Sequence, residues 1–376
     1  MNPIQSLDRH ETTEFIYDSI CFSAPTEPNT PADVRAGIDR AMALDSRPVF
    51  LEGLCKRLNA LGVCCSADDM HIMLSEVKNR FRTKLKKNCP RAVQNWVRGV
   101  TPGTANRLNH FDLCYALEMD LQQTADFFQK YFLTIPFQCK SRIDAIFLYC
   151  LSHNKPYTVV QKMLDTSEDV VLQDAAHTST SQIFSAILET DDDEKFLQYL
   201  SGHCYGNQQQ FQLARSHIAE EVALVKQSLL SQDYTGSLSP TRLNSSTIAE
   251  LIGSKYQQRE KKISVQKLPR RFTESLPNDV TLGRILNGET ASYELLRKTL
   301  MLLKFYNFYD GSPNVDENSI AQNLMDFYDE LNAELNACGF AQIYEMHPFD
   351  CLLLYCANSY DPILALQLVN EQQFGQ

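Results

Sequence analysis

The chain has 376 residues, of which 44% are hydrophobic and 22% charged, and its net charge is −11 at pH 7. This composition is ordinary for a globular protein, and the length indicates two or three domains. With only 14 Gly and 15 Pro, the chain lacks the frequent turns of an all-β sandwich or barrel. The acidic total does not favour bulk binding to nucleic acid or anionic membranes, so either role requires a local basic patch.

The start of the chain and its cysteines bear on compartment. Residues 1–5 carry neither basic charges nor an apolar run, unlike a signal peptide. No stretch approaches the ~18 uninterrupted apolar residues that span a membrane. The 12 Cys are scattered and include no Cys-x-x-Cys pair, the spacing typical of zinc ligands. We therefore expect a cytoplasmic protein with reduced cysteines and with no metal, cofactor or membrane association.

The predicted elements are all helices, from capping residues, glycine stops and apolar residues at 3.6 periodicity. Residues 1–29 are expected to be loosely held. Helices are then predicted at 30–44, 48–61, 66–87, 90–96, 106–118, 121–132, 140–152 and 157–164.

The rest of the chain is also predicted to be helical. Helices are expected at 179–188, from Asp191 onward, and at 208–230, followed by a Ser- and Thr-rich linker at 231–244. A capping box at 247–250 restarts helical structure. The last predicted helices are 292–308, 317–337 and 348–371.

An internal repeat relates the two ends of the chain. The stretch from Asp144 to Cys150 (DAIFLYC) recurs from Asp350 to Cys356 (DCLLLYC). Upstream, 96–99 resembles 285–288, and each leads to an arginine, Arg107 or Arg297. Convergence of similar helical hairpins on similar apolar patterns is the alternative explanation. The predicted fold is therefore all-α, with two related multi-helix repeats, 30–165 and 245–376, joined by a helical middle segment at 166–244.

A basic segment occurs in this acidic chain. Between Val77 and Phe111 there is no acidic residue, and the window holds nine positive charges: Lys78, Arg80, Arg82, Lys84, Lys86, Lys87, Arg91, Arg98 and Arg107. Because nine like charges repel one another, we expect an external polyanion, in particular a phosphate backbone. The alternatives are an acidic protein surface, this chain's own included, and a solvated face with no ligand.

A second basic segment lies in the second predicted repeat, just before the 285–288 match. It contains one acid, Glu260, against Lys255, Arg259, Lys261, Lys262, Lys267, Arg270 and Arg271. Because both basic segments precede matching short segments, we expect the two halves to have the same function.

A resemblance to a known family rests on residues 92–99 (AVQNWVRG), followed by Pro102, Leu113, Ala116, Leu117 and Met119. They resemble the recognition helix and the following helix of Cro/Xre-type (lambda-repressor-like) helix-turn-helix domains, over about residues 54–120. The resemblance implies that Arg91, Gln94 and Asn95 face the major groove, where such side chains make bidentate contacts to bases. The predicted helix at 66–87 is longer than its counterpart in that family. The whole chain is also similar to all-helical bacterial proteins that carry such a repeat.

The sequence offers little catalytic chemistry. The eight His are dispersed and form no His-Glu-x-x-His motif, and Cys204 beside His203 is the only local hint of a nucleophile and base. We therefore predict a non-enzymatic, regulatory protein that binds nucleic acid, DNA rather than RNA. The alternative is an interaction scaffold of a mobile element or phage-defence system, and a homo-oligomer is left open. Trp96, the only Trp, is predicted to be buried.

Overall fold

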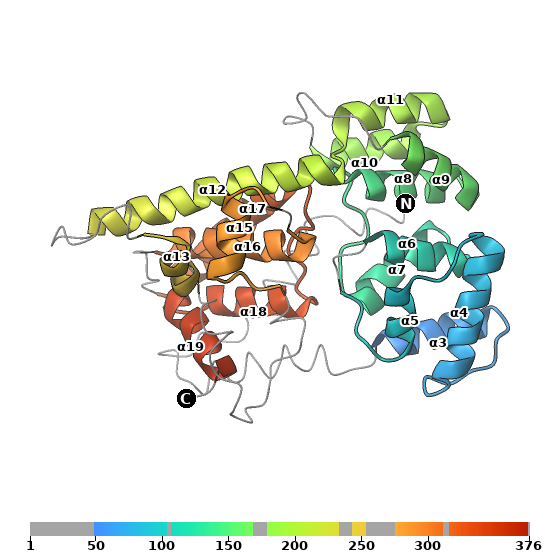
Figure 1. The fold of residues 1–376 in the computed structure, drawn as a ribbon, viewed down its shortest axis with the longest axis horizontal. Helices are drawn as coiled ribbons and strands as arrows, with labels where there is room; N and C mark the ends of the chain where they lie inside the picture. The colour runs from blue at the N-terminus through green and yellow to red at the C-terminus, as the bar shows by residue number, and fades with distance from the viewer. Residues whose placement is uncertain are drawn as a thin grey trace. The chain divides into compact units, whose positions relative to one another are not determined.

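The computed structural model describes residues 49–103, 107–167, 179–232, 243–252, 275–289, 291–310 and 316–374. The elements within these ranges are all helices, and their one β-type contact is an isolated bridge between Ser141 and Tyr205. The predicted all-α class is confirmed. The chain divides into two compact units, each described here by itself (Figure 1). The N-terminal unit comprises 47–210 with 339–341, and the C-terminal unit contains 211–338 and 342–376.

The helices of the N-terminal unit are short and follow one another closely. They are α3 (Val49–Ala60), α4 (Met70–Lys84), α5 (Arg91–Val97), α6 (Arg107–Ala116), α7 (Leu121–Phe127), α8 (Arg142–Ser152), α9 (Tyr157–Thr166), α10 (Thr180–Glu189) and α11 (Asp193–His203). A π-helical turn, η3 (Phe128–Phe132), continues α7. The middle segment predicted at 166–244 is shared between the two units, because α10 packs against α8 while most of α12 (Asn207–Gln232) belongs to the C-terminal unit.

The C-terminal unit contains longer helices. They are α13 (Ser245–Leu251), α15 (Asp279–Leu286), α16 (Tyr293–Tyr309), α17 (Glu317–Ala337), α18 (Pro348–Ala357) and α19 (Pro362–Phe374), with α16 packed against α17. No helix of the described residues has the length and hydropathy needed to cross a membrane.

Three predicted helix boundaries need correction. The helix expected at 66–87 begins at Met70, because the backbone N–H and Oγ of Ser66 both bond to Asp69 (2.8 and 2.7 Å). The restart expected at Thr247 begins at Ser245, with Asn244 accepting a hydrogen bond from the Thr247 N–H. The single helix expected at 348–371 is two, α18 and α19, since proline is accommodated at a helix start but not inside a helix. The predictions for 1–29, 30–44 and most of the linker lie outside the described residues.

The aromatic core of the N-terminal unit surrounds Trp96. This side chain is 5% exposed, which confirms its predicted burial. Its ring stacks on His110 at a centroid distance of 4.7 Å and meets Phe50 and Phe132 edge-on at 6.1 and 6.0 Å. These contacts join α5 to α3, α6 and η3.

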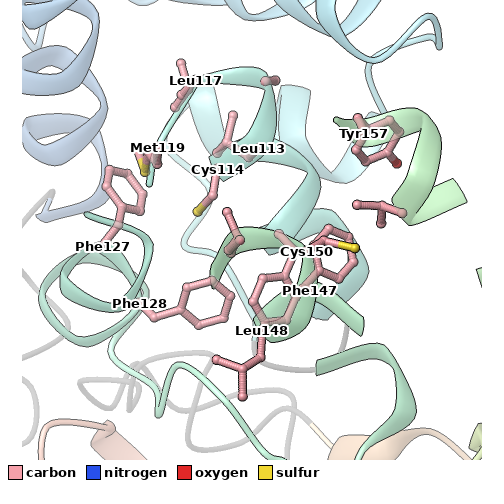
Figure 2. Close-up of a cluster of buried hydrophobic side chains, with 14 of the residues drawn as sticks. Leu113, Cys114, Leu117, Met119, Phe127, Phe128, Phe147, Leu148, Cys150 and Tyr157 are labelled. Carbon is pink, nitrogen blue, oxygen red and sulfur yellow. The ribbon is translucent and has the colours of Figure 1, made fainter. Parts of the chain in front are cut away.

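A second part of this core lies between α6, α7 and α8 (Figure 2). Leu113, Leu117, Phe127, Phe128 and Leu148 are buried there beside Cys114 and Cys150. Burial raises the pKa of the Cys150 thiol to about 12. These cysteines therefore behave as small, neutral core side chains.

Candidate nucleic-acid interface

The first basic segment lies mostly on α4, α5 and the connection between them, with Arg98 as the C-cap of α5 and Arg107 as the first residue of α6. α4 buries Met73, Val77 and Phe81 at helical spacing, so its other face is open to solvent. α5 buries Val93, Trp96 and Val97 and ends at Gly99, whose φ of +92° suits a residue without Cβ. The connection runs from Leu85 to Pro90. The basic side chains of the segment divide into those that pair with acids of the same unit and those that do not.

Glu118 pairs with two of the nine cations. Its carboxylate accepts hydrogen bonds from Arg80 Nη1 and Lys84 Nζ, both at 2.8 Å. Arg80 also pairs with Glu76 one turn earlier, at 2.7 Å. The hydrogen bond from Lys84 is the main cause of a lowered pKa for the Glu118 carboxyl. Arg80 and Lys84 are therefore neutralised within the unit.

Lys87 is held in a partly buried polar cluster. Its ammonium donates to Asp112 and, at 2.7 Å, to the hydroxyl of Tyr157, and that hydroxyl donates to Asp112 at 2.5 Å. Burial raises the pKa of Asp112, and the hydrogen bonds from Lys87 and Tyr157 offset part of this effect. Lys87 thereby ties the α4–α5 connection to α6 and α9.

Arg107 lies inside the unit and is 7% exposed. Its Nε donates to both carboxylate oxygens of Asp144, at 2.9 and 2.8 Å, and its Nη2 donates to the carbonyls of Ile135 and Pro136. The backbone N–H of Gln138 donates to the same carboxylate at 2.9 Å. Arg107 is a structural residue in this arrangement.

The C-terminal unit contains a matching cluster. Arg297 Nη1 and Nη2 donate to the two oxygens of Asp350 at 2.9 and 2.7 Å, and Nη2 also donates to the Gln342 carbonyl at 3.1 Å. The N–H of Tyr344 donates to Asp350 at 3.0 Å. One constant offset in sequence relates 136, 138 and 144 to 342, 344 and 350. The same backbone groups therefore surround both ion pairs, which supports the predicted repeat.

Five cations of the segment remain exposed. Among the described residues no carboxylate lies within ion-pair distance of Lys78, Arg82, Lys86, Arg91 or Arg98. Arg82 donates to the neutral Asn79 at 3.1 Å, and Arg98 approaches Asn95 at 3.5 Å. We call these five residues the basic surface.

Gln94 and Asn95 lie on α5 beside the basic surface, and both are half-buried. Gln94 Nε2 donates to the Cys89 carbonyl at 2.8 Å. This hydrogen bond joins α5 to the connection that precedes it. Asn95 shares a helical face with Arg91 and Arg98, at spacings of four and three residues. Of the three residues expected to face the major groove, Arg91 and Asn95 therefore share the face of Arg98, whereas the Gln94 amide bonds to the backbone before α5.

The other expected features give mixed results. The second basic segment, from Lys255 to Arg271, lies outside the described residues. Cys204 donates to the Cys139 carbonyl at 3.1 Å, whereas the His203 ring contacts the Tyr199 carbonyl at 3.0 Å, so these two neighbours do not pair. No group of three or more His, Cys, Asp or Glu among the described residues is arranged to hold a metal ion.

No protein-family model, curated protein or solved structure matches the chain. The helix-turn-helix resemblance therefore rests on the sequence motif and stays a prediction. The connection of α4 to α5, from Leu85 to Pro90, is longer than the turn of about 3–4 residues in such motifs.

Proposed function

We propose that the N-terminal unit binds nucleic acid, DNA in preference to RNA, through the basic surface. The observation that carries the proposal is the set of five exposed cations, Lys78, Arg82, Lys86, Arg91 and Arg98, on two consecutive helices and their connection with no carboxylate partner among the described residues. A phosphate backbone supplies regularly spaced anions and releases counterions when lysine and arginine neutralise it.

The contacts within the unit divide the basic segment by role. Lys87 and Arg107 hold the fold through Asp112 and Asp144, so their charge is already used. Arg80 and Lys84 are paired with Glu118. A nucleic-acid phosphate would therefore have to displace this carboxylate before it could contact either cation. Phosphate contact therefore begins at the basic surface, with Asn95 next to it on α5. The proposed role is non-enzymatic and regulatory.

An acidic protein is the second candidate partner, and one observation favours it. Carboxylates of this chain already dock on the neighbouring cations, as Glu118 does on Arg80 and Lys84. The alternative scaffold role would use the basic surface in the same way. The two candidates differ because backbone binding tolerates any nucleic-acid sequence and weakens steeply with salt.

Fluorescence anisotropy of the full chain with random duplex DNA, single-stranded DNA and RNA tests the proposal. We expect duplex DNA to bind at low salt, with a log–log salt slope that falls by about 0.9 for each phosphate contact removed. Arg82→Gln and Arg98→Gln should each lower the slope by that amount.

Lys195→Gln is the matched control. It removes the same charge from an exposed position on α11, away from α4 and α5 (Figure 1). It should leave the slope unchanged. Absence of binding to all three nucleic acids at a protein concentration of about 100 µM, the weak end of non-specific affinity, would overturn the proposal. RNA bound in preference to duplex DNA would overturn its choice of nucleic acid.

A further inference from the structure

The end of α3 reverses the chain sharply. Gly62 has a φ of +85°, its N–H donates to the Asn59 carbonyl at 3.0 Å, and the Val63 N–H donates to the Leu58 carbonyl at 3.0 Å. This pair of bonds is the Schellman arrangement, which ends a helix with a left-handed glycine. The residues after Gly62 consequently run back beside the last turns of α3.

Asn59 fixes the returning chain at Cys65. Its Nδ2 donates to the Cys65 carbonyl at 2.9 Å, and its Oδ1 accepts the Cys65 N–H at 3.1 Å. Cys55 lies one turn earlier on the same face of α3, where its thiol donates to the Cys65 carbonyl at 3.1 Å. Asn59 Nδ2 also donates to the Cys55 sulfur at 3.2 Å. The turn and the asparagine together therefore hold the Cys55 thiol against the backbone of Cys65.

Accessibility separates this pair and its neighbour Cys64 from the other cysteines that the structure describes. Cys55 and Cys65 are half-buried and Cys64 is exposed, whereas Cys89, Cys114, Cys139, Cys150, Cys204, Cys338, Cys351 and Cys356 are buried. A small oxidant in solvent therefore meets the Cys55–Cys65 pair before the core thiols. Because the Cys55 thiol lies 3.1 Å from the Cys65 carbonyl oxygen, rotation of the two side chains brings their sulfurs within reach of the S–S bond length of about 2.0 Å.

We propose that Cys55 and Cys65 form a reversible disulfide when the protein meets a hydroperoxide. One of the two thiolates attacks one peroxide oxygen and becomes a sulfenic acid, and hydroxide leaves and is protonated to water. The other thiolate then attacks the sulfenyl sulfur, and the second hydroxide leaves and is protonated to water. Two thiols are thus oxidised by two electrons and one hydrogen peroxide is reduced to two waters, and a reducing thiol reverses the step by exchange.

The surroundings of Cys65 make closure of the disulfide depend on pH. Burial and the neighbouring Cys55 raise the pKa of Cys65 to about 11, so little of it is thiolate at neutral pH. Because the thiolate is the reactive form, closure becomes faster as pH rises.

Peptide mapping tests the site. The full chain is treated with hydrogen peroxide, its free thiols are blocked, and it is digested with trypsin without reduction. Cleavage after Lys56, Arg57 and Lys78 places Cys55 on one peptide and both Cys64 and Cys65 on another. We expect a cross-linked species joining the two peptides, formed at the expense of two thiols and lost on addition of dithiothreitol.

Single Cys→Ser variants identify the partner of Cys55. The link should persist in Cys64→Ser, the matched control for its neighbour, and disappear in Cys65→Ser. Persistence in Cys65→Ser with loss in Cys64→Ser would overturn the assignment, and so would accumulation of Cys55 sulfinic acid without any link. The readout is a mass and involves no nucleic acid, so its outcome is independent of the proposed function.

Discussion

The Arg107–Asp144 and Arg297–Asp350 clusters are alike inside their units, but the short helices that precede them in sequence differ at the surface. By the match of 96–99 with 285–288, exposed Arg91 of α5 corresponds to Val280 of α15, which is 47% exposed, and Arg98 corresponds to Asn287. The buried contacts are therefore alike in both units, whereas Val280 and Asn287 carry no charge at the positions of Arg91 and Arg98. The segment that would match the cations of α4, from Lys255 to Arg271, lies outside the described residues. Cations at these two positions are not a requirement of the fold, which supports their proposed role in binding.

The largest expected effect tests the two buried arginine–aspartate clusters. Asp144→Ala and Asp350→Ala should each lower the free energy of unfolding by about 3–5 kcal/mol, because each leaves a buried guanidinium without its counter-charge. Urea unfolding followed by circular dichroism measures the loss. Asp126→Ala, which removes an exposed pair with Lys130, should cost less than about 1 kcal/mol. A small cost at only one of the two buried aspartates would break the equivalence of the clusters.

The short helices provide the next test. Trp96→Ala should cost about 3–5 kcal/mol and Ile285→Ala about 2–5 kcal/mol, since each side chain anchors its helix in a buried core. The Trp96 variant also loses ring contacts with Phe50, His110 and Phe132. Thermal unfolding midpoints report both changes. An unaltered midpoint for Trp96→Ala would contradict the packing described around α5.

The contrast between paired and unpaired cations predicts a gain of binding. Glu118→Gln releases Lys84 from its ion pair, whereas Arg80 keeps its pair with Glu76. One further phosphate contact should steepen the salt slope by about 0.9, equivalent to roughly threefold more affinity lost between about 50 and 200 mM salt. The anisotropy titration above measures it.

Glu52→Gln serves as the control for this gain, because it removes an exposed acid from α3 in the same unit. Its slope should match that of the unmodified chain. If the slope of Glu118→Gln also matched it, Lys84 would take no part in binding.

The sequence predicts helices well and tertiary pairings poorly. The apolar period and the cap predicted α17 at 317–337 without error, since such signals are local. The pairing of Lys84 with Glu118 was not visible, because the acid lies outside the charged window and only the fold brings it close. Arg107 and Asp144 were both visible as repeated residues, but nothing in their spacing showed that they meet. The stop at Gly62 was visible, whereas the contact of Cys55 with Cys65 depends on how the chain returns.

The smallest expected effect is a pH dependence of the stability of the C-terminal unit. In the C-terminal unit, His217 of α12 pairs with Glu334 of α17 through Nδ1 and Oε1 at 2.6 Å. The hydrogen bond to Glu334 raises the pKa of His217 more than burial lowers it, and the same bond lowers the pKa of Glu334.

Stability from a histidine with a raised pKa is fully present below the unfolded value of about 6.5 and is lost as pH rises through the folded value. Stability from Glu334 is present above the unfolded glutamate pKa of about 4.3 and is lost as pH falls through the lowered folded value. Between about pH 6 and 9 the titration of His217 should therefore cost the C-terminal unit about 1 kcal/mol, the upper value for a partly exposed pair. Urea unfolding at these two pH values measures it, and His217→Gln should remove the difference. An equal loss of stability in His217→Gln would show that another group causes the pH dependence.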